Sequence, residues 1–210
     1  MSLGTRAPVE AGPAEPKARA DVRVGRASAW WILIAGVIGL LSSANLLIEK
    51  IAMLKNPDYV PSCSINPVVA CGSVINTPQA AVFGPPNPLY GVIGFTVVIV
   101  TGVLALAKVP LPRWYWMGLM TGTGLALVFV HWLKYETLYD IGALCPYCMV
   151  VWAVTIPLFA VVAPIALRPL AGNRVARFLY NWRWPLVALW FVSVILEILV
   201  HFWYYWSTLI

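Results

Sequence analysis

The stretch LCPYCMVVWAVTIPLFAVVAPIAL, residues 144–167, decides the fold because it opens on a pair of cysteines and continues as one apolar run. A transmembrane helix needs about 20 mainly apolar residues, so this run is long enough to cross a bilayer. Its first turn carries Cys145 and Cys148, and Pro146 stands where a helix accepts proline without losing a hydrogen bond. The stretch therefore predicts a membrane helix that begins at two cysteines.

Four further apolar runs have the same character. They cover residues 30–48, 89–107, 116–133 and 184–203. The composition agrees, because the 210-residue chain is 61% hydrophobic and 10% charged, which leaves too few charges to cover a soluble domain. The first run is longer than the hydrophobic region of a cleavable signal peptide, so we expect it to remain as a membrane helix. The sequence predicts an all-α integral membrane protein with five transmembrane helices.

The segments between the runs predict the domain organisation. Residues 1–29 are rich in alanine, proline and charge without apolar periodicity, which favours a flexible cytoplasmic tail. Residues 30–167 should form a four-helix bundle that includes a long polar loop at residues 49–88. Residues 168–183 are a basic cytoplasmic link, and residues 184–210 contain the fifth helix and the C-terminus.

Lysine and arginine are divided unevenly between the two sides that five crossings define. One side carries Arg6, Lys17, Arg19, Arg23, Arg26, Lys108, Arg113, Arg168, Arg174, Arg177 and Arg183, and the other carries Lys50, Lys55 and Lys134. Because cationic loops stay in the cytoplasm, we predict a cytoplasmic N-terminus and an extracytoplasmic C-terminus. The net charge of +6 then reflects topology and attraction to anionic membrane lipid, and it gives no support for nucleic-acid binding.

All four cysteines fall on the extracytoplasmic side of this topology. Cys63 and Cys71 lie in the long first loop, and Cys145 and Cys148 lie where the third loop enters the fourth helix. Disulfides form and persist in such a compartment. A Cys-X-X-Cys pair at a helix N-terminus is also reactive, because the helix dipole and free N–H groups stabilise the nucleophilic thiolate. The pattern predicts thiol–disulfide chemistry.

Two other interpretations of the cysteines remain open. One is a non-catalytic membrane scaffold with structural disulfides, although a bridge across two intervening residues removes little chain entropy and stabilises poorly. The other is a metal-binding protein with four thiolate ligands. The step from Cys63 to Cys71 is looser than usual ligand spacing and no histidine lies near the cysteines in sequence, so we predict no metal ligand. Replacing Cys145 or Cys148 by serine separates a redox relay from a scaffold.

The order of the motifs resembles one known family. It consists of Cys63, seven residues, Cys71, Val74, Thr77, a Gly/Pro stretch, Asn-Pro-Leu-Tyr-Gly at residues 87–91 and Ile-Gly-Ala-Leu-Cys-Pro-Tyr-Cys at residues 141–148. This combination, over about residues 30–165, is similar to the vitamin K epoxide reductase family. The resemblance implies a four-helix bundle around a quinone pocket that the first loop closes from outside. Another quinone-coupled class of bacterial disulfide generator has its two cysteine pairs in the opposite order.

The resemblance implies an oxidoreductase that passes electrons from protein thiols to a quinone of the menaquinone or ubiquinone type. Cys63 and Cys71 would exchange with a separate thioredoxin-like thiol oxidase and then reduce the Cys145–Cys148 disulfide, which supports disulfide formation in exported proteins. In relatives a loop cysteine attacks the first cysteine of the helix pair, which here joins Cys71 to Cys145. Cys148 then faces the quinone, and it also lies about one turn deeper in the membrane than Cys145.

Three more positions follow from the same resemblance. Asn87 matches an asparagine that donates a hydrogen bond to a quinone carbonyl, and it is equally suited to cap the second helix. Thr77 matches a serine or threonine beside the loop cysteine, but capping of a short helix is the simpler role. Trp152 stands where animal relatives have a tyrosine that contacts the quinone. The resemblance implies that its indole donates a hydrogen bond to the quinone or stacks on it. The segment 78–83 is expected to lie on the membrane and cover the pocket.

Three ionisable residues lie in the predicted membrane helices. His131, near the outer end of the third helix, is either a proton carrier or, more simply, a neutral histidine satisfied by a helix neighbour. Glu197 and His201 are four residues apart in the fifth helix, which places them on one face and predicts that they pair with each other. We expect this helix to serve packing or the docking of a partner.

Overall fold

The computed structural model describes residues 21–168 and 174–208. Five of its helices are long and apolar enough to cross a membrane, which confirms the predicted all-α membrane fold. They are α1 (Arg26–Lys55), α3 (Asn87–Leu106), α4 (Arg113–Tyr135), α5 (Pro146–Ala166) and α6 (Arg174–His201). Their ends extend beyond several of the apolar runs because basic, polar and aromatic residues continue the helices at the membrane boundary.

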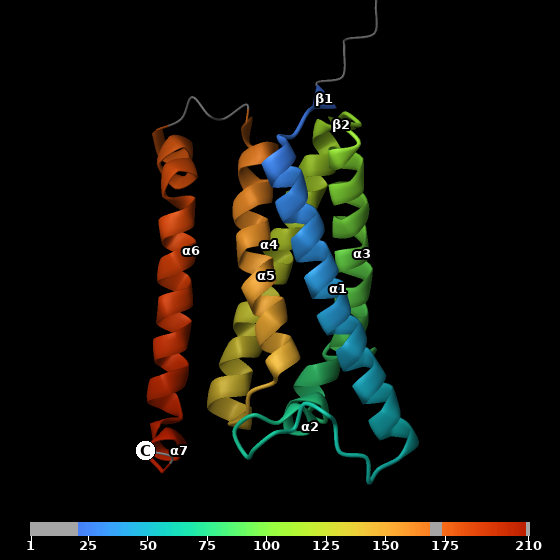
Figure 1. Cartoon of the computed structure of the whole chain (residues 1–210), viewed down its shortest axis with the longest axis vertical. Helices are drawn as coiled ribbons and strands as arrows, with labels where there is room; N and C mark the ends of the chain where they lie inside the picture. Colours follow the sequence, from blue (N-terminus) through green and yellow to red (C-terminus); the bar gives the residue numbers. More distant parts are fainter. Residues whose placement is uncertain (1–20, 169–173, 209–210) are drawn as a thin grey trace, which may run out of the picture.

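Helices α1, α3, α4 and α5 form a bundle, and α6 runs beside it (Figure 1). Helix α1 packs mainly against α3 and α5, while α4 packs against α5. At one end of the bundle, which we call the cysteine end, the loop after α1 contains α2 (Cys71–Ile75) and the 3₁₀ helix η1 (Pro78–Ala81). The short α7 (Trp203–Trp206) follows α6 at the same end (Figure 1). We call the opposite end the basic end.

At the basic end, a two-stranded ladder ties the start of the described chain to the bundle. Strand β1 (Asp21–Val22) pairs antiparallel with β2 (Leu111–Pro112), which lies between α3 and α4. The guanidinium of Arg168, just after α5, donates to the backbone carbonyl of Arg23 at 2.7 Å. Residues 21–25 belong to the segment 1–29 for which the sequence predicts a flexible tail, and residues 1–20 of that segment lie outside the described residues.

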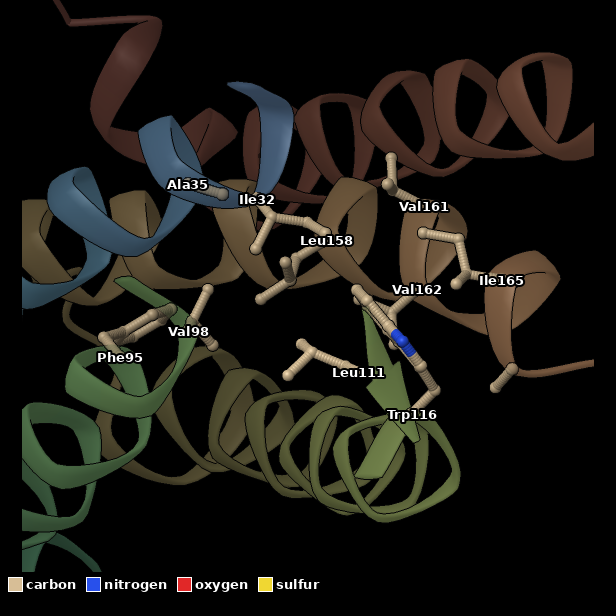
Figure 2. Packing of buried hydrophobic residues seen from close by; sticks show 11 residues of the cluster. Ile32, Ala35, Phe95, Val98, Leu111, Trp116, Leu158, Val161, Val162 and Ile165 are labelled. Atoms are coloured by element: carbon tan, nitrogen blue, oxygen red, sulfur yellow. The ribbon is translucent and has the colours of Figure 1, made fainter. Parts of the chain in front are cut away.

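The largest buried cluster draws side chains from β2 and all four bundle helices (Figure 2). Ile32 of α1, Val98 of α3 and Trp116 of α4 are all buried in it. Small residues let the helices approach: a Cβ on Gly102 would come within 2.8 Å of the backbone of Leu33. Membrane helices commonly pack in this way. Lipid acyl chains are as apolar as the helix surfaces, so no hydrophobic force brings the helices together and close van der Waals contact does so instead. The bundle therefore rests on close helix contact.

Helix α4 continues beyond its apolar run. It leads into the π-helix η2 (Glu136–Ile141) and stops at Gly142, whose φ of 68° is the left-handed conformation that glycine adopts easily. The apolar runs that end at residue 133 and begin at residue 144 leave residues 134–143 as the predicted third loop, and helix over residues 134–141 shows that this part of the prediction is wrong. Thr137 and Leu138 are buried in the extra turns, so tertiary packing stabilises helix where the sequence shows polar residues.

Candidate thiol–disulfide site

The four cysteines meet at the cysteine end of the bundle. Cys63 and Cys71 form a disulfide, whereas Cys145 and Cys148 are free thiols. The Sγ atom of Cys145 lies 3.3 Å from the Sγ atom of Cys71. Both of these residues are 0% exposed, and Cys63 is 6% exposed. One thiol of the helix pair is therefore in contact with the loop disulfide and shielded from water.

A short hydrogen-bonded bridge brings these two sulfur atoms together. The N–H of Leu144 donates to the carbonyl of Val68 at 2.6 Å, and the N–H of Ala70 donates to the carbonyl of Leu144 at 2.9 Å. This is an isolated parallel β-bridge between the loop and the segment before α5. Cys71 directly follows Ala70 and Cys145 directly follows Leu144. The bridge thus juxtaposes two cysteines that are 74 residues apart in sequence.

Polar side chains shape the loop on its way to the bridge. The side-chain oxygen of Asn66 accepts from the N–H groups of Val68 at 3.0 Å and Val69 at 2.7 Å. The hydroxyl oxygen of Ser64 accepts from the N–H of Gly72, in the first turn of α2, at 3.3 Å. Asparagine and serine commonly form such local bonds, which favour turns over regular structure. They fix the backbone on both sides of the bridge strand.

The loop is also anchored on α1. The hydroxyl of Ser62 donates to the carboxylate of Glu49 at 2.5 Å, and the ammonium of Lys50 donates to the carbonyl of Ile75, at the end of α2, at 3.0 Å. Leu46, one turn earlier in α1, is buried in the same cluster as Cys63, Cys71 and Cys145. The disulfide therefore packs against apolar side chains of α1, and hydrogen bonds of Glu49 and Lys50 hold the loop in place on either side.

The start of α5 favours a reactive Cys145. This residue is the N-cap of the helix and Pro146 is its first residue, as the sequence predicts. The pKa of the Cys145 thiol is lowered, first by the Cys148 thiol that can donate to it and then by the backbone N–H groups of Cys148 and Tyr147, while burial acts in the opposite direction. A lower pKa increases the thiolate fraction and makes the sulfur a better leaving group.

The side-chain capping hydrogen bonds that the sequence suggests for Asn87 and Thr77 are not formed, although Thr77 occupies the N-cap position of η1. Helix α3 begins at Asn87 itself with Pro86 as its N-cap, and the Asn87 amide N–H donates to the carbonyl of Gln79 at 2.6 Å. The Thr77 hydroxyl precedes η1 but donates backward to the carbonyl of Val74 at 2.8 Å. Both side chains instead tie η1 to its neighbours. The Asn87 Oδ1 atom is buried without a hydrogen-bond partner among the described residues.

The segment 78–83 lies at the cysteine end and consists of the short helix η1 followed by the exposed Val82 and Phe83. The amide N–H₂ of Gln79 in η1 donates to the carboxylates of Glu136, at 3.3 Å, and Asp140, at 3.0 Å, both in η2. The rings of Phe83 and Phe129 lie 5.6 Å apart, which adds an aromatic contact to α4. The segment is thus attached to the end of α4 as well as to α3.

Trp152 lies four residues after Cys148 in α5, which places both side chains on the same face of the helix. The tryptophan is only 3% exposed, so its indole belongs to the interior of the bundle. Cys148 is half-buried and follows Cys145 by three residues in the direction of the membrane span. The structure therefore orders Cys145, Cys148 and Trp152 by increasing depth from the cysteine end.

His131 has the environment of a neutral, satisfied histidine. Its Nε2 atom lies 2.7 Å from the indole nitrogen of Trp190, which can only donate, so Nε2 is the acceptor. The Nδ1 atom lies 2.7 Å from the carbonyl of Leu127 and therefore carries the proton. Both ring nitrogens are used, and one partner is a helix neighbour four residues earlier. This agrees with the simpler of the two sequence interpretations.

The predicted pair between Glu197 and His201 is wrong. The carboxylate of Glu197 forms an ion pair with Lys134, and it accepts a hydrogen bond from the Tyr139 hydroxyl at 3.1 Å. The ring of His201 packs edge-on against the ring of Tyr139, with 5.0 Å between centroids. The Lys134 ammonium comes from another helix, α4, so sequence spacing within α6 cannot reveal it as the partner of Glu197.

In the described part of the chain, no three side chains of histidine, cysteine, aspartate or glutamate are arranged to hold a metal ion. A multi-helix membrane bundle with a free thiol against a buried disulfide defines the class of a membrane thiol–disulfide protein. The model of the vitamin K epoxide reductase family matches residues 30–163, so the chain belongs to this family. No curated protein matches the sequence. Family membership makes the chain a multi-pass membrane thiol–disulfide oxidoreductase.

Proposed function

We propose that the protein reoxidises a separate thioredoxin-like thiol oxidase and passes the electrons to a membrane quinone of the menaquinone or ubiquinone type. The observation that carries this proposal is the 3.3 Å contact between Cys145 and Cys71 of the loop disulfide. Thiol–disulfide exchange proceeds by attack of a thiolate on a disulfide sulfur, so contact between the two groups is its geometric requirement. The same reaction would support disulfide formation in exported proteins.

The first step exchanges electrons with the partner. A thiolate of the partner attacks the Cys63–Cys71 disulfide, the partner's second thiol resolves the mixed disulfide, and the partner leaves oxidised with Cys63 and Cys71 as thiols. Cys63 suits the attack because it is slightly exposed, whereas Cys71 is fully buried. The loop therefore presents one sulfur to the partner and the other to the helix pair.

The second step takes place inside the protein. The Cys71 thiolate attacks Cys145 of the Cys145–Cys148 disulfide, forming a Cys71–Cys145 disulfide and releasing the Cys148 thiolate. Cys63 then attacks Cys71 and releases Cys145. The lowered pKa of Cys145 favours this release. The products are a loop disulfide and two helix thiols, which is the combination found in this structure.

The third step returns the helix pair to its disulfide. A quinone bound beside this pair would supply the electron sink, accepting two electrons and two protons while the Cys145 and Cys148 thiols become a disulfide. Cys148 is suited to face it, being about 4.5 Å deeper along the helix than Cys145. Asn87 is suited to bind the quinone, because one N–H of its amide is free to donate to a quinone carbonyl. Its Oδ1 atom is buried and has no hydrogen-bond partner among the described residues. Trp152 would close the inner side of this site.

Turnover of the purified protein in lipid vesicles tests the proposal. With a reduced thioredoxin-like partner and a soluble quinone analogue, we expect quinone reduction that falls to background in Cys145→Ser and Cys148→Ser. Cys148→Ser should in addition accumulate the Cys71–Cys145 disulfide, because the Cys145 thiolate can attack Cys71 of the loop disulfide and release Cys63, while no Cys148 thiol is present to reopen the new bond at Cys145. Cys145→Ser is its matched control, since it lacks the sulfur that bonds to Cys71. A scaffold with structural disulfides would keep its behaviour in both variants, and failure to trap the mixed disulfide would break the proposed order.

We also propose that the cysteine end faces the outside of the cytoplasmic membrane. The support is the uneven distribution of Lys and Arg, which leaves Lys50, Lys55 and Lys134 as the cations of that side. In intact cells treated with a membrane-permeant reductant, a membrane-impermeant maleimide should label Cys63. Labelling of either cysteine pair from the cytoplasmic side alone would contradict both the orientation and the relay.

A further inference from the structure

We infer that the C-terminal half of α6 is a positioning element for thiol exchange, because it buries the bridge that sets Cys145 against Cys71. This inference rests on the proposed function and assigns a role to the fifth transmembrane helix. The family match ends at residue 163, so it does not include α6. The helix contributes no sulfur, and it acts through the backbone of the residues next to the cysteines.

The inference starts from one buried cluster at the cysteine end. Its six buried members are Val68, Leu138, Leu144, Val194, Ile198 and Phe202. Val194 and Ile198 belong to α6, and Phe202 follows its last residue. Val68 and Leu144 are residues whose backbone groups form the bridge. Side chains from α6 and from the residue that follows it thus supply three of the six buried members of the cluster that encloses the bridge residues.

The sequence of α6 is patterned for this contact. Val194, Ile198 and Phe202 recur every four residues and form one stripe, with exposed fractions of 7%, 8% and 0%. On the other faces of the same helix, Val192 and Ile195 are more than half exposed. Only 6% of the membrane-spanning window of α6 is buried, and Val194 and Ile198 are the buried residues among those of α6 whose side chains the structure describes.

Polar contacts fix the rotation of α6 at the same level. Glu197, adjacent to the stripe, pairs with Lys134 of α4 and with the Tyr139 hydroxyl of η2. A carboxylate held by two partners from the bundle restricts both the height and the turning of the helix. The apolar stripe is therefore directed toward Val68 and Leu144 and away from lipid.

The bridge needs such a cover because it is small. A single β-bridge with two hydrogen bonds is not supported by neighbouring strands, and water competes for backbone groups that become exposed. Loosening it would separate Cys71 from Cys145, each of which directly follows a bridge residue. A misplacement of about 1 Å can reduce the rate of a reaction between positioned groups about 100-fold. Burial by α6 thus protects the contact on which exchange depends.

Two isoleucines of α6 give a matched test. Ile198→Ala removes side-chain volume from the cluster, where the residue is 8% exposed, and Ile195→Ala makes the same change where the residue is 55% exposed. Both are placed in the Cys148→Ser background and reconstituted as the full chain. Amide hydrogen exchange is followed in peptides that contain Ala70 and Leu144, with peptides of α1 and α3 as the reference for general loosening. Conversion of the Cys63–Cys71 disulfide and the Cys145 thiol into the Cys71–Cys145 disulfide and a Cys63 thiol is followed by acid quenching and mass spectrometry.

We expect Ile198→Ala to speed exchange of the bridge amides relative to the reference peptides and to slow mixed-disulfide formation about tenfold. Ile195→Ala should leave both unchanged, and Ile198→Leu should restore both to within about twofold of the parent because it refills most of the volume. Val194→Ala and Val192→Ala, at 7% and 53% exposure, are a milder matched pair should Ile198→Ala not fold. Val194→Ala should then be the member that slows the reaction.

Equal behaviour of the buried and exposed variants overturns the inference and leaves the proposed function intact. Faster bridge exchange with unchanged mixed-disulfide formation overturns it as well, since the bridge would then not set the sulfur contact. Failure of the proposed function has a different signature, because the parent Cys148→Ser protein would itself form no Cys71–Cys145 disulfide.

Discussion

The contact between α1 and α3 and the contact between α6 and the bundle are built on different principles. Between α1 and α3, a Cβ on Gly36, Gly39 or Gly102 would come within 3 Å of a neighbouring atom. Helix α6 instead contacts the bundle through side chains, namely the ion pair of Glu197, the Trp190 indole, the apolar stripe and the ring of Trp184 against Trp31. Close backbone packing leaves no room for change, whereas side-chain contacts can be altered one at a time. A fifth helix can thus be attached to a finished bundle through a few residues.

The largest effect is expected from Gly102→Ala in α3. The new Cβ would lie 2.8 Å from the backbone of Leu33, which cannot move aside as a side-chain tip can, so the helices must separate. Overpacking of this kind costs about 1–3 kcal/mol. The measurement is unfolding of the purified protein in detergent, followed by loss of helical signal.

Gly94→Ala in the same helix is the matched control. A Cβ at Gly94 would meet nothing within 4 Å, so alanine should stabilise the helix by about 0.5–1 kcal/mol. Opposite signs for the two substitutions would support dependence on close packing between α1 and α3. Two variants of equal stability would contradict it.

A smaller effect is expected at the ion pair between α4 and α6. The side chains of Lys134 and Glu197 are 14% and 27% exposed, so partial solvation weakens their interaction. Polar contacts between membrane helices contribute about 0.6 kcal/mol on average and up to about 1.7 kcal/mol. A double-mutant cycle with Lys134→Met and Glu197→Gln should give a coupling energy in this range. Additive effects of the two substitutions would show that the pair does not hold α6.

The sequence predicts the five spans because each is a long apolar run, and a membrane helix is specified almost entirely by local composition. The start of α5 can also be predicted from the sequence, since Cys145, Pro146 and the following apolar residues are contiguous. The bridge between Val68 and Leu144 cannot, because it joins segments far apart in sequence. Its one local signal is the Asn66-Pro67 pair, which is typical of a turn.

The site residues divide in the same way. The contact of Cys71 with Cys145 was expected from a family resemblance, and spacing by itself does not give it. The cap expected at Asn87 is wrong because α3 starts at Asn87 itself, whereas Thr77 is the N-cap of η1 but its hydroxyl donates to an earlier carbonyl. A shift of one residue in the start of a helix is enough to remove the capping role of a side chain. Helix boundaries are the part of a secondary-structure prediction that sequence specifies least.

The smallest effect is expected from the contact between His131 and Trp190. The indole N–H donates to Nε2, and Nδ1–H donates to the carbonyl of Leu127, so the ring holds one proton and has no free site for a second. Replacing Trp190 by Phe should cost about 0.6 kcal/mol, the average for a hydrogen bond between membrane helices. His131→Phe should cost a similar amount and leave quinone reduction unchanged. A loss of turnover in His131→Phe without a matching loss in Trp190→Phe would instead make this histidine a proton carrier, and α4 would then contribute to the chemistry as well as to the attachment of α6.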